Sequence, residues 1–182
     1  MPELPEVETI CRGLRSLIVA KAIKSVSSDT PKSFPNPPDQ VANFVIDASV
    51  IGVRRRAKVL LIDLSSDYTL VCHLKMTGQL VFIAAARAGK VRFGGGHPTD
   101  SLVGKLPDRS TRVVIECADG SQLFFNDQRK FGWMKLYPTI EVPNIDFMQR
   151  VGPEPLEDAF TAQEFIPRMR QRSGTTIKAA VL

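Results

Sequence analysis

The sequence predicts an α+β protein in which an N-terminal β-sandwich flanked by helices precedes a smaller helical domain. Three observations predict this class. An amphipathic helix comes first, many short β-like segments with close turns follow it, and the composition changes near residues 138–143, beyond which only helical patterns occur. We therefore expect two domains, a sandwich at 1–138 and a helical domain at 139–182.

The first helix is expected to begin at Pro5, because proline suits the first helical position and the acids Glu6 and Glu8 complement the positive end of the helix dipole. Apolar residues then recur at three- and four-residue spacing, which predicts one buried stripe made of Val7, Ile10, Cys11, Leu14, Leu17 and Ile18. This helix should anchor the first residues of the chain to the core.

Short segments rich in β-branched and apolar residues follow the helix. Strands are predicted at 22–26, 50–54, 59–64, 70–74, 79–83, 112–117, 122–125 and 133–137. A proline-rich segment at 30–38 and a short helix at 39–45 separate the first two, and a glycine-rich loop at 88–107 is expected to interrupt the sheet. Asp119-Gly120 marks a hairpin turn. Many short strands with close turns favour a sandwich or a barrel.

Helical patterns occupy the end of the chain, at 144–150 and 161–172. The second of these carries a basic cluster, formed by Arg168, Arg170 and Arg172. Residues 177–182 begin a further helix that lacks a C-terminal cap. We therefore expect the chain to be cut short within its second domain.

Composition and charge restrict the classes of function. The chain has 24 Lys and Arg against 19 Asp and Glu, a net charge of +5, which permits a nucleic-acid partner without requiring one. No apolar run reaches the roughly 18 residues that span a bilayer. The acidic, proline-containing N-terminus also differs from an export signal. No membrane partner is therefore expected, and the expected location is cytoplasmic.

The cysteines and histidines predict no metal site. Cys11, Cys72 and Cys117 lie far apart without Cys-x-x-Cys pairing, and His73 and His97 add no metal-ligand spacing. Cys72 and Cys117 alternate with apolar neighbours in predicted strands. We therefore expect buried, reduced thiols.

Proline at position 2 permits removal of the initiator methionine, which leaves a secondary amine at the start of the chain. An α-amino group titrates at about 7.7–8.0, so a substantial minority is unprotonated and nucleophilic at neutral pH. Such an amine can attack the anomeric carbon of a sugar, with Glu3 beside it as general acid or base. The alternatives for Pro2 are an ordinary processed terminus and a tautomerase, built from small βαβ units, in which the proline is a general base.

Five segments in a fixed order resemble the bacterial formamidopyrimidine-DNA glycosylases. They read PELPEVET at 2–9, RRAKVLL at 55–61, HLKMTG at 73–78, NDQRKFG at 126–132 and VGPEPL at 151–156. The resemblance runs the whole length of the chain. It implies a catalytic β-sandwich domain followed by an incomplete helix-two-turn-helix DNA-binding domain.

The resemblance implies a catalytic role for three residues. Pro2 would be the nucleophile that forms a Schiff base, Glu3 would protonate the sugar ring oxygen as it opens, and Lys58 would assist the elimination steps. The segment at 55–61 resembles the strand that carries the catalytic lysine in this family. The alternative for Lys58 is a strand lysine whose aliphatic stem lies along apolar surface.

The resemblance also implies a DNA wedge made of Met76, Arg129 and Phe131, which we call the wedge residues. An enzyme that acts on a base must extrude it from the duplex, and these side chains would fill the gap and contact the orphaned partner base. The alternative for Met76 and Phe131 is a place in the core. The Thr-Gly and the Gly that follow them favour loops.

The resemblance also implies phosphate contacts for three further cations, Arg56, Lys130 and Lys178. The alternative for each of them is a solvated surface charge. Many relatives have a DNA-contacting histidine just before the strand at 112–117, and residues 108–111 contain none. Arg109 or Ser110 would supply that contact here.

The activity that the resemblance implies is base-excision repair, with removal of oxidised purines (8-oxoguanine and formamidopyrimidines) and β,δ-elimination at the abasic site. Leu4 favours this branch over the endonuclease VIII group, which usually has glycine there. The expected partner is double-stranded DNA with oxidised bases or abasic sites, bound by a monomer at the bacterial nucleoid. Relatives continue with a Gly-Asn loop and a four-cysteine zinc finger, so zinc is implied only beyond Leu182, and no cofactor is expected for this segment. The alternative is a DNA-binding module with little or no turnover.

Overall fold

Two antiparallel sheets form the larger part of the computed structural model, which describes residues 1–85 and 91–181. One sheet has five strands in the order β1-β7-β8-β5-β6, and the other has four in the order β2-β3-β4-β9. The bounds are β1 Ile23–Ser28, β2 Val50–Arg56, β3 Val59–Leu64, β4 Tyr68–His73, β5 Gly78–Ile83, β6 Arg92–Gly96, β7 Thr111–Cys117, β8 Gln122–Asp127 and β9 Trp133–Pro138. Buried side chains of both sheets share one hydrophobic core, so the predicted β-sandwich is confirmed.

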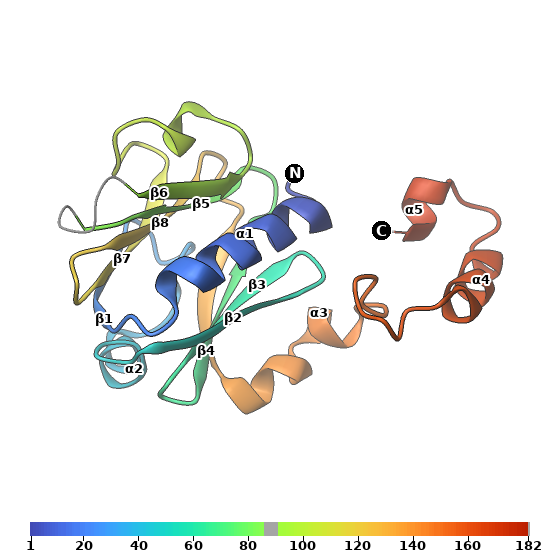
Figure 1. Cartoon of the computed structure of the whole chain (residues 1–182), viewed down its shortest axis with the longest axis horizontal. Helices are drawn as coiled ribbons and strands as arrows, with labels where there is room; N and C mark the ends of the chain where they lie inside the picture. The colour runs from blue at the N-terminus through green and yellow to red at the C-terminus, as the bar shows by residue number, and fades with distance from the viewer. Residues whose placement is uncertain (86–90, 182) are drawn as a thin grey trace. The chain divides into compact units, whose positions relative to one another are not determined.

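Helix α1 (Leu4–Ile18) closes one open side of the sandwich. It contacts β2 and β6, which are the edge strands of the two sheets, and in Figure 1 it runs as a blue ribbon between them. Its apolar stripe is buried as predicted at Val7, Ile10, Cys11, Leu14 and Ile18, whereas Leu17, also predicted, is only half-buried. The start of the chain is therefore held against the core through a full helical face.

The glycine-rich region contains a strand where the sequence predicted only a loop. Strand β6 extends the five-stranded sheet by pairing with β5, and a short 3-10 helix, η2 (Asp100–Leu102), follows it. The glycines allow this because α1 lies directly above them: a Cβ at Gly95 would stand 2.5 Å from Cγ1 of Ile10. The prediction of an interruption was wrong because absent side chains, which usually indicate a loop, here make room for the helix.

A proline-rich segment covers β9, the edge strand at the far side of the four-stranded sheet. The backbone N–H of Met134 donates to the Ser33 carbonyl at 2.8 Å. The Asn36 side chain accepts from the Leu136 N–H at 2.8 Å and donates to the Leu136 carbonyl at 3.1 Å. Helix α2 (Pro38–Phe44) follows, close to the predicted range. The edge of the sheet is thus protected from pairing with another chain.

The chain divides into two units, Met1–Gln149 and Arg150–Leu182. The sequence placed the boundary after residue 138, but η3 (Thr139–Asn144) and the single turn α3 (Asp146–Gln149) belong to the first unit. The reason is a second, smaller core, in which Val142 and Met148 are buried together with Val59, Leu61 and Val71.

The second unit contains two helices, α4 (Ala162–Gln171) and α5 (Ile177–Val181), near the predicted ranges. In α4, Arg168 forms an ion pair with Glu164 at 2.8 Å, one helical turn earlier. Among the residues that the structure describes, no helix is both long and apolar enough to cross a membrane.

Candidate active site

The N-terminus of α1 holds the first two candidate residues in fixed positions. Pro2 is buried, whereas Met1 is more than half exposed. Glu3 is the N-cap of the helix, and its backbone N–H donates to Oε2 of Glu6 at 2.9 Å. The Glu3 carbonyl accepts the first helical bond, from the Val7 N–H at 3.1 Å. Capping therefore fixes the backbone on which the Glu3 carboxylate is carried.

Lys58 forms an ion pair with Glu3. Its Nζ lies 2.5 Å from Oε2 of Glu3, and the two side chains are 24% and 35% exposed. The family resemblance placed Lys58 on a strand, but it occupies the turn between β2 and β3, outside the predicted strands at 50–54 and 59–64, and β3 begins one residue later at Val59. A residue near the start of the chain and a hairpin turn are thus brought together.

Arg55 ties this turn to α1. Its side chain is only 4% exposed, and Nε donates to Oε2 of Glu8 at 2.7 Å. Nη1 donates to the Ala57 carbonyl at 3.0 Å, directly before Lys58. The hydrogen bonds from Arg55, and then those from Arg12, hold the pKa of the Glu8 carboxyl below its ordinary value. The sequence analysis gave Arg55 no role, although it belongs to the same motif as Lys58.

The wedge residues lie together on two neighbouring loops. Met76 is 40% exposed and Phe131 is 45% exposed, so the core alternative is wrong for both. Nη1 of Arg129 lies 3.2 Å from the Met76 sulfur, and the Arg129 guanidinium lies 5.0 Å from the centre of the Phe131 ring. Two loops separated by about fifty residues of sequence therefore present one apolar and cationic cluster.

A buried carboxylate organises the loop at 127–132, which we call the wedge loop. Asp127 is fully buried, and its Oδ1 accepts from the Thr77 hydroxyl and from the Arg129 N–H at 3.2 Å. Its Oδ2 accepts from the Gly132 N–H at 2.7 Å. The carboxylate satisfies donors on both sides of Phe131 and reaches the Met76 loop through Thr77. Sequence reasoning missed Asp127, although an aspartate shortly before a glycine is a familiar turn signal.

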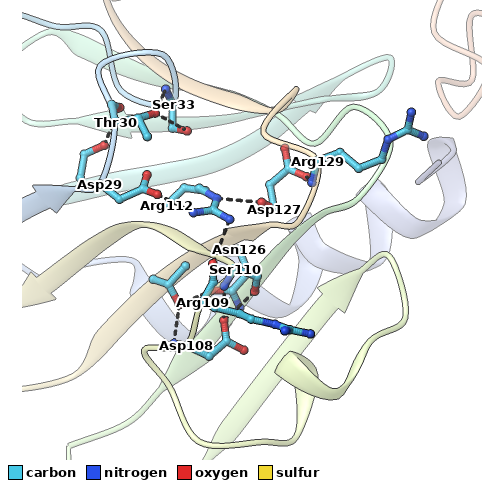
Figure 2. Close-up of polar contacts among 12 residues, drawn as sticks. Asp29, Thr30, Ser33, Asp108, Arg109, Ser110, Arg112, Asn126, Asp127 and Arg129 are labelled. Atoms are coloured by element: carbon cyan, nitrogen blue, oxygen red, sulfur yellow. Dashed lines mark hydrogen bonds and ion pairs between the residues drawn. The ribbon is translucent and has the colours of Figure 1, made fainter.

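Arg112 joins the wedge loop to two further loops (Figure 2). Its side chain is 7% exposed, Nη1 pairs with Oδ2 of Asp29, and Nε donates to the Asp127 carbonyl at 2.7 Å. Nη2 donates to the Arg109 carbonyl at 3.0 Å. One buried guanidinium thus links three loops, through two backbone carbonyls and one carboxylate. Figure 2 shows it between Asp29 and Asp127, with the Arg129 side chain extending away from the network.

Three of the loops share a backbone feature. Ala57, Lys75 and Lys130 have positive φ values of 48°, 52° and 57°. Each stands immediately before a residue that the sequence analysis singled out, namely Lys58, Met76 and Phe131. Left-handed backbone costs a residue with a side chain about 1 kcal/mol or more, and it persists where the surroundings determine it.

The remaining candidate residues have different degrees of exposure. Arg109 and Lys130 are exposed, and Arg56 is half-buried. Ser110 is buried and hydrogen-bonded to Asp108 through both its hydroxyl, at 2.6 Å, and its N–H, at 2.7 Å, so Arg109 is the better-placed phosphate contact of that pair. The side chain of Lys178 lies outside the described residues.

The cysteines and acids offer no metal centre in the described structure. Cys11, Cys72 and Cys117 are free and buried, as predicted, and burial raises the pKa of each thiol. Within residues 1–85 and 91–181, no group of three or more His, Cys, Asp or Glu side chains is arranged to hold a metal ion.

His73 makes the stability of the sandwich dependent on pH. Burial, followed by the charges of Lys75 and Lys58, lowers its pKa to about 4. The unfolded chain therefore binds more protons than the folded chain between about pH 6.5 and pH 4, and the free energy of unfolding should fall as the pH falls through this range. The loss should reach up to about 3 kcal/mol.

This prediction can be checked by urea denaturation at pH 7 and pH 5. His73→Phe should show a smaller loss between these pH values than the parent, whereas His97→Gln, which changes the other histidine, should keep the parent's loss. Equal losses in all three proteins would contradict the role of His73.

The fold and the site define a class: a two-sheet antiparallel sandwich closed by an N-terminal helix, with proline, glutamate and lysine at the start of that helix. The antiparallel pairing of both sheets differs from the βαβ units of the tautomerase alternative. The chain belongs to the formamidopyrimidine-DNA glycosylase family, because the family pattern described as the formamidopyrimidine-DNA glycosylase N-terminal domain matches residues 1–134.

Curated relatives match the chain over its whole length. The formamidopyrimidine-DNA glycosylases of Cereibacter sphaeroides and Rhodopseudomonas palustris are 37% and 39% identical to it. The chain spans about 60% of the length of these relatives. A solved complex of the Lactococcus lactis protein with Fapy-dG-containing DNA superimposes with a TM-score of 0.71 at 26% identity, over 94% of this chain and 55% of that one. Another complex of the Lactococcus lactis protein, with abasic-site DNA, matches with the same TM-score of 0.71.

Proposed function

We propose that this chain supplies the catalytic part of a base-excision DNA glycosylase that removes oxidised purines and then cleaves the abasic site. The observation that supports it most is the ion pair of 2.5 Å between Lys58 and Glu3, beside the buried Pro2. It brings a carboxylate and an ammonium group together at the point where removal of Met1 would expose a secondary amine. Two solved structures of the Lactococcus lactis relative are complexes with Fapy-dG-containing or abasic-site DNA, which fits this class of substrate.

The chemistry begins with the lone pair of the Pro2 nitrogen. It attacks C1′ of the damaged nucleotide and the bond from C1′ to the base breaks, so the base leaves with the bonding electrons and takes the proton that the Pro2 nitrogen gives up. The Glu3 carboxyl, after it takes up a proton from solvent, passes that proton to the ring oxygen as the bond from C1′ to this oxygen breaks, which leaves an iminium ion between Pro2 and C1′ and a Glu3 carboxylate. Loss of a C2′ proton then expels the 3′ phosphate, and a second elimination expels the 5′ phosphate. The ammonium group of Lys58 stabilises the departing phosphate charge.

DNA binding is proposed for the exposed face of the loops. Met76 and Phe131 would enter the gap left by the extruded nucleotide, and Arg129 would contact the orphaned base. Contacts to phosphates are proposed for Arg56, Arg109, Lys130 and Lys178. The duplex would be bound by a monomer, with the second unit as part of a helix-two-turn-helix domain.

Zinc enters the proposal only through the family resemblance, which implies it for a four-cysteine finger beyond Leu182. Among the residues that the structure describes, no group of three or more His, Cys, Asp or Glu side chains is arranged to hold a metal ion.

Borohydride trapping tests the proposal. The chain with Met1 removed is expected to form a covalent adduct with duplex DNA that carries 8-oxoguanine opposite cytosine, because borohydride reduces the iminium ion to a stable amine. The adduct would be measured as a shifted band on a denaturing gel, with the undamaged duplex as the control. Absence of an adduct on lesion-bearing and on abasic DNA would refute the proposed enzyme.

A DNA-binding module with little turnover is the second candidate. Its support is the exposure of Met76, Arg129 and Phe131, which would bind DNA without taking part in the chemistry. Single-turnover cleavage of pre-formed abasic DNA separates the two, because this substrate requires no base recognition. Clear cleavage rules out the pure binding module.

A further inference from the structure

A third cation lies beside the exposed aromatic ring of the wedge. Lys32 belongs to the loop between β1 and α2, is exposed, and has its Nζ 5.6 Å from the centre of the Phe131 ring. The Arg129 guanidinium lies 5.0 Å from the same ring. Cations are attracted to aromatic faces, and two cationic side chains from separate loops lie near the Phe131 ring.

The backbone around Lys32 is fixed on its C-terminal side. Ser33 is fully buried, and its carbonyl accepts the Met134 N–H at 2.8 Å, on the strand that directly follows the wedge loop. Phe34 is buried in the main core. The position of Lys32 beside Phe131 is therefore a property of the fold rather than of a free loop.

The N-terminal side of the same loop is fixed by Arg112. The Asp29 N–H donates to the Arg112 carbonyl at 3.0 Å, and the Asp29 carboxylate pairs with the Arg112 guanidinium. That guanidinium also donates to the Asp127 carbonyl at 2.7 Å, at the start of the wedge loop. Figure 2 shows this chain of contacts from Asp29 through Arg112 to Asp127. The two loops are thus joined at both ends.

The charge of Lys32 is available to a ligand. No acidic side chain forms an ion pair with it in the part of the chain that the structure describes. A ring that enters duplex DNA passes between two rows of phosphates, which carry one charge per roughly 1.7 Å of helix axis. A cation held 5.6 Å from that ring therefore faces phosphate oxygens when the ring is inserted.

We propose that Lys32 is a further DNA-binding residue, which contacts a backbone phosphate beside the nucleotide gap that Phe131 fills. This inference rests on the proposed function. It adds the β1–α2 loop to a binding surface that the sequence motifs assign only to the loops at 73–78 and 126–132 and to single cations. A lysine makes this contact as a point charge, so it contributes affinity without reading the sequence.

The test is the salt dependence of binding to a duplex that carries tetrahydrofuran, a stable abasic-site analogue. For Lys32→Ala, the slope of log K against log salt concentration should be smaller than the parent's by about 0.9, the value for one lost phosphate contact. Lys32→Arg should keep the parent's slope. The matched control is Lys24→Ala, which removes one positive charge from the other end of β1, where Lys24 pairs with Glu116 at 3.0 Å. It should also keep the parent's slope.

Two results would overturn the assignment of Lys32 without affecting the proposed function. One is an unchanged slope in Lys32→Ala. The other is an equal fall in the slope for Lys32→Ala and Lys24→Ala, which would mark a general charge effect. A parent chain that shows no salt-dependent binding to this duplex would overturn the proposed function together with it. Thermal unfolding of each variant confirms that the compared proteins are folded.

Discussion

A chain with two extra residues in front of Pro2 is expected to form no borohydride-trapped adduct with lesion-bearing DNA, and excision should slow by about a thousandfold or more. The extension turns the secondary amine into an amide nitrogen, whose lone pair is delocalised and not nucleophilic. Glu3 and Lys58 would remain, but neither replaces the attacking atom. Gel analysis of the trapped product and single-turnover kinetics measure the two effects.

Pro2→Gly is the matched variant for this experiment. Glycine also permits removal of Met1 and leaves a free α-amine, so some trapping should persist. Mass spectrometry of each purified protein establishes which residue is first. A chain that still carries Met1 and nevertheless becomes trapped on lesion-bearing DNA would contradict the assignment of the nucleophile.

Replacement of Arg112 by methionine should lower the free energy of unfolding by about 3–5 kcal/mol, the usual cost of removing one partner from a buried ion pair. The Asp29 carboxylate would lose its pair, and the Asp127 and Arg109 carbonyls would lose their donors. Urea denaturation followed by tryptophan fluorescence measures the change, because the single Trp133 lies in β9 beside this region.

Arg54→Met is the control for Arg112→Met. Arg54 also pairs with a carboxylate, through two bonds of 2.7 and 3.0 Å to Asp63, but its side chain is 46% exposed. Exposed pairs contribute about 1 kcal/mol or less. Adding Asp29→Leu to Arg112→Met should restore part of the lost stability by removing the uncompensated charge. Similar losses for Arg54→Met and Arg112→Met would show that burial of the Arg112 pair has no special effect.

Local patterns were sufficient to predict most of the fold. The stripe of α1 and the strands at 59–64 and 112–117 were predicted close to their observed bounds, because periodicity is a property of each segment alone. Strand β6 was missed for the opposite reason. Its glycines match a loop locally, and only contact with α1 explains them.

Only those residues of the candidate site that belong to a sequence motif could be predicted. The chemistry of an N-terminal amine pointed to Pro2 and Glu3, the resemblance added Lys58, and the structure brings Glu3 and Lys58 into contact. Arg112 and Asp29 are 83 positions apart in the sequence, so no spacing within one segment reveals their pair. Asp127 and Thr77 are 50 positions apart, and the same limit applies. Support for a site comes from tertiary contacts, which a pattern read along one chain does not contain.

The left-handed residues Ala57, Lys75 and Lys130 have a consequence for the proposed binding of DNA. Each sharp bend sets the backbone that carries the next side chain before any duplex arrives, so less backbone freedom would be lost on binding. The conformational penalty would then be met once, during folding, instead of at every encounter with a duplex.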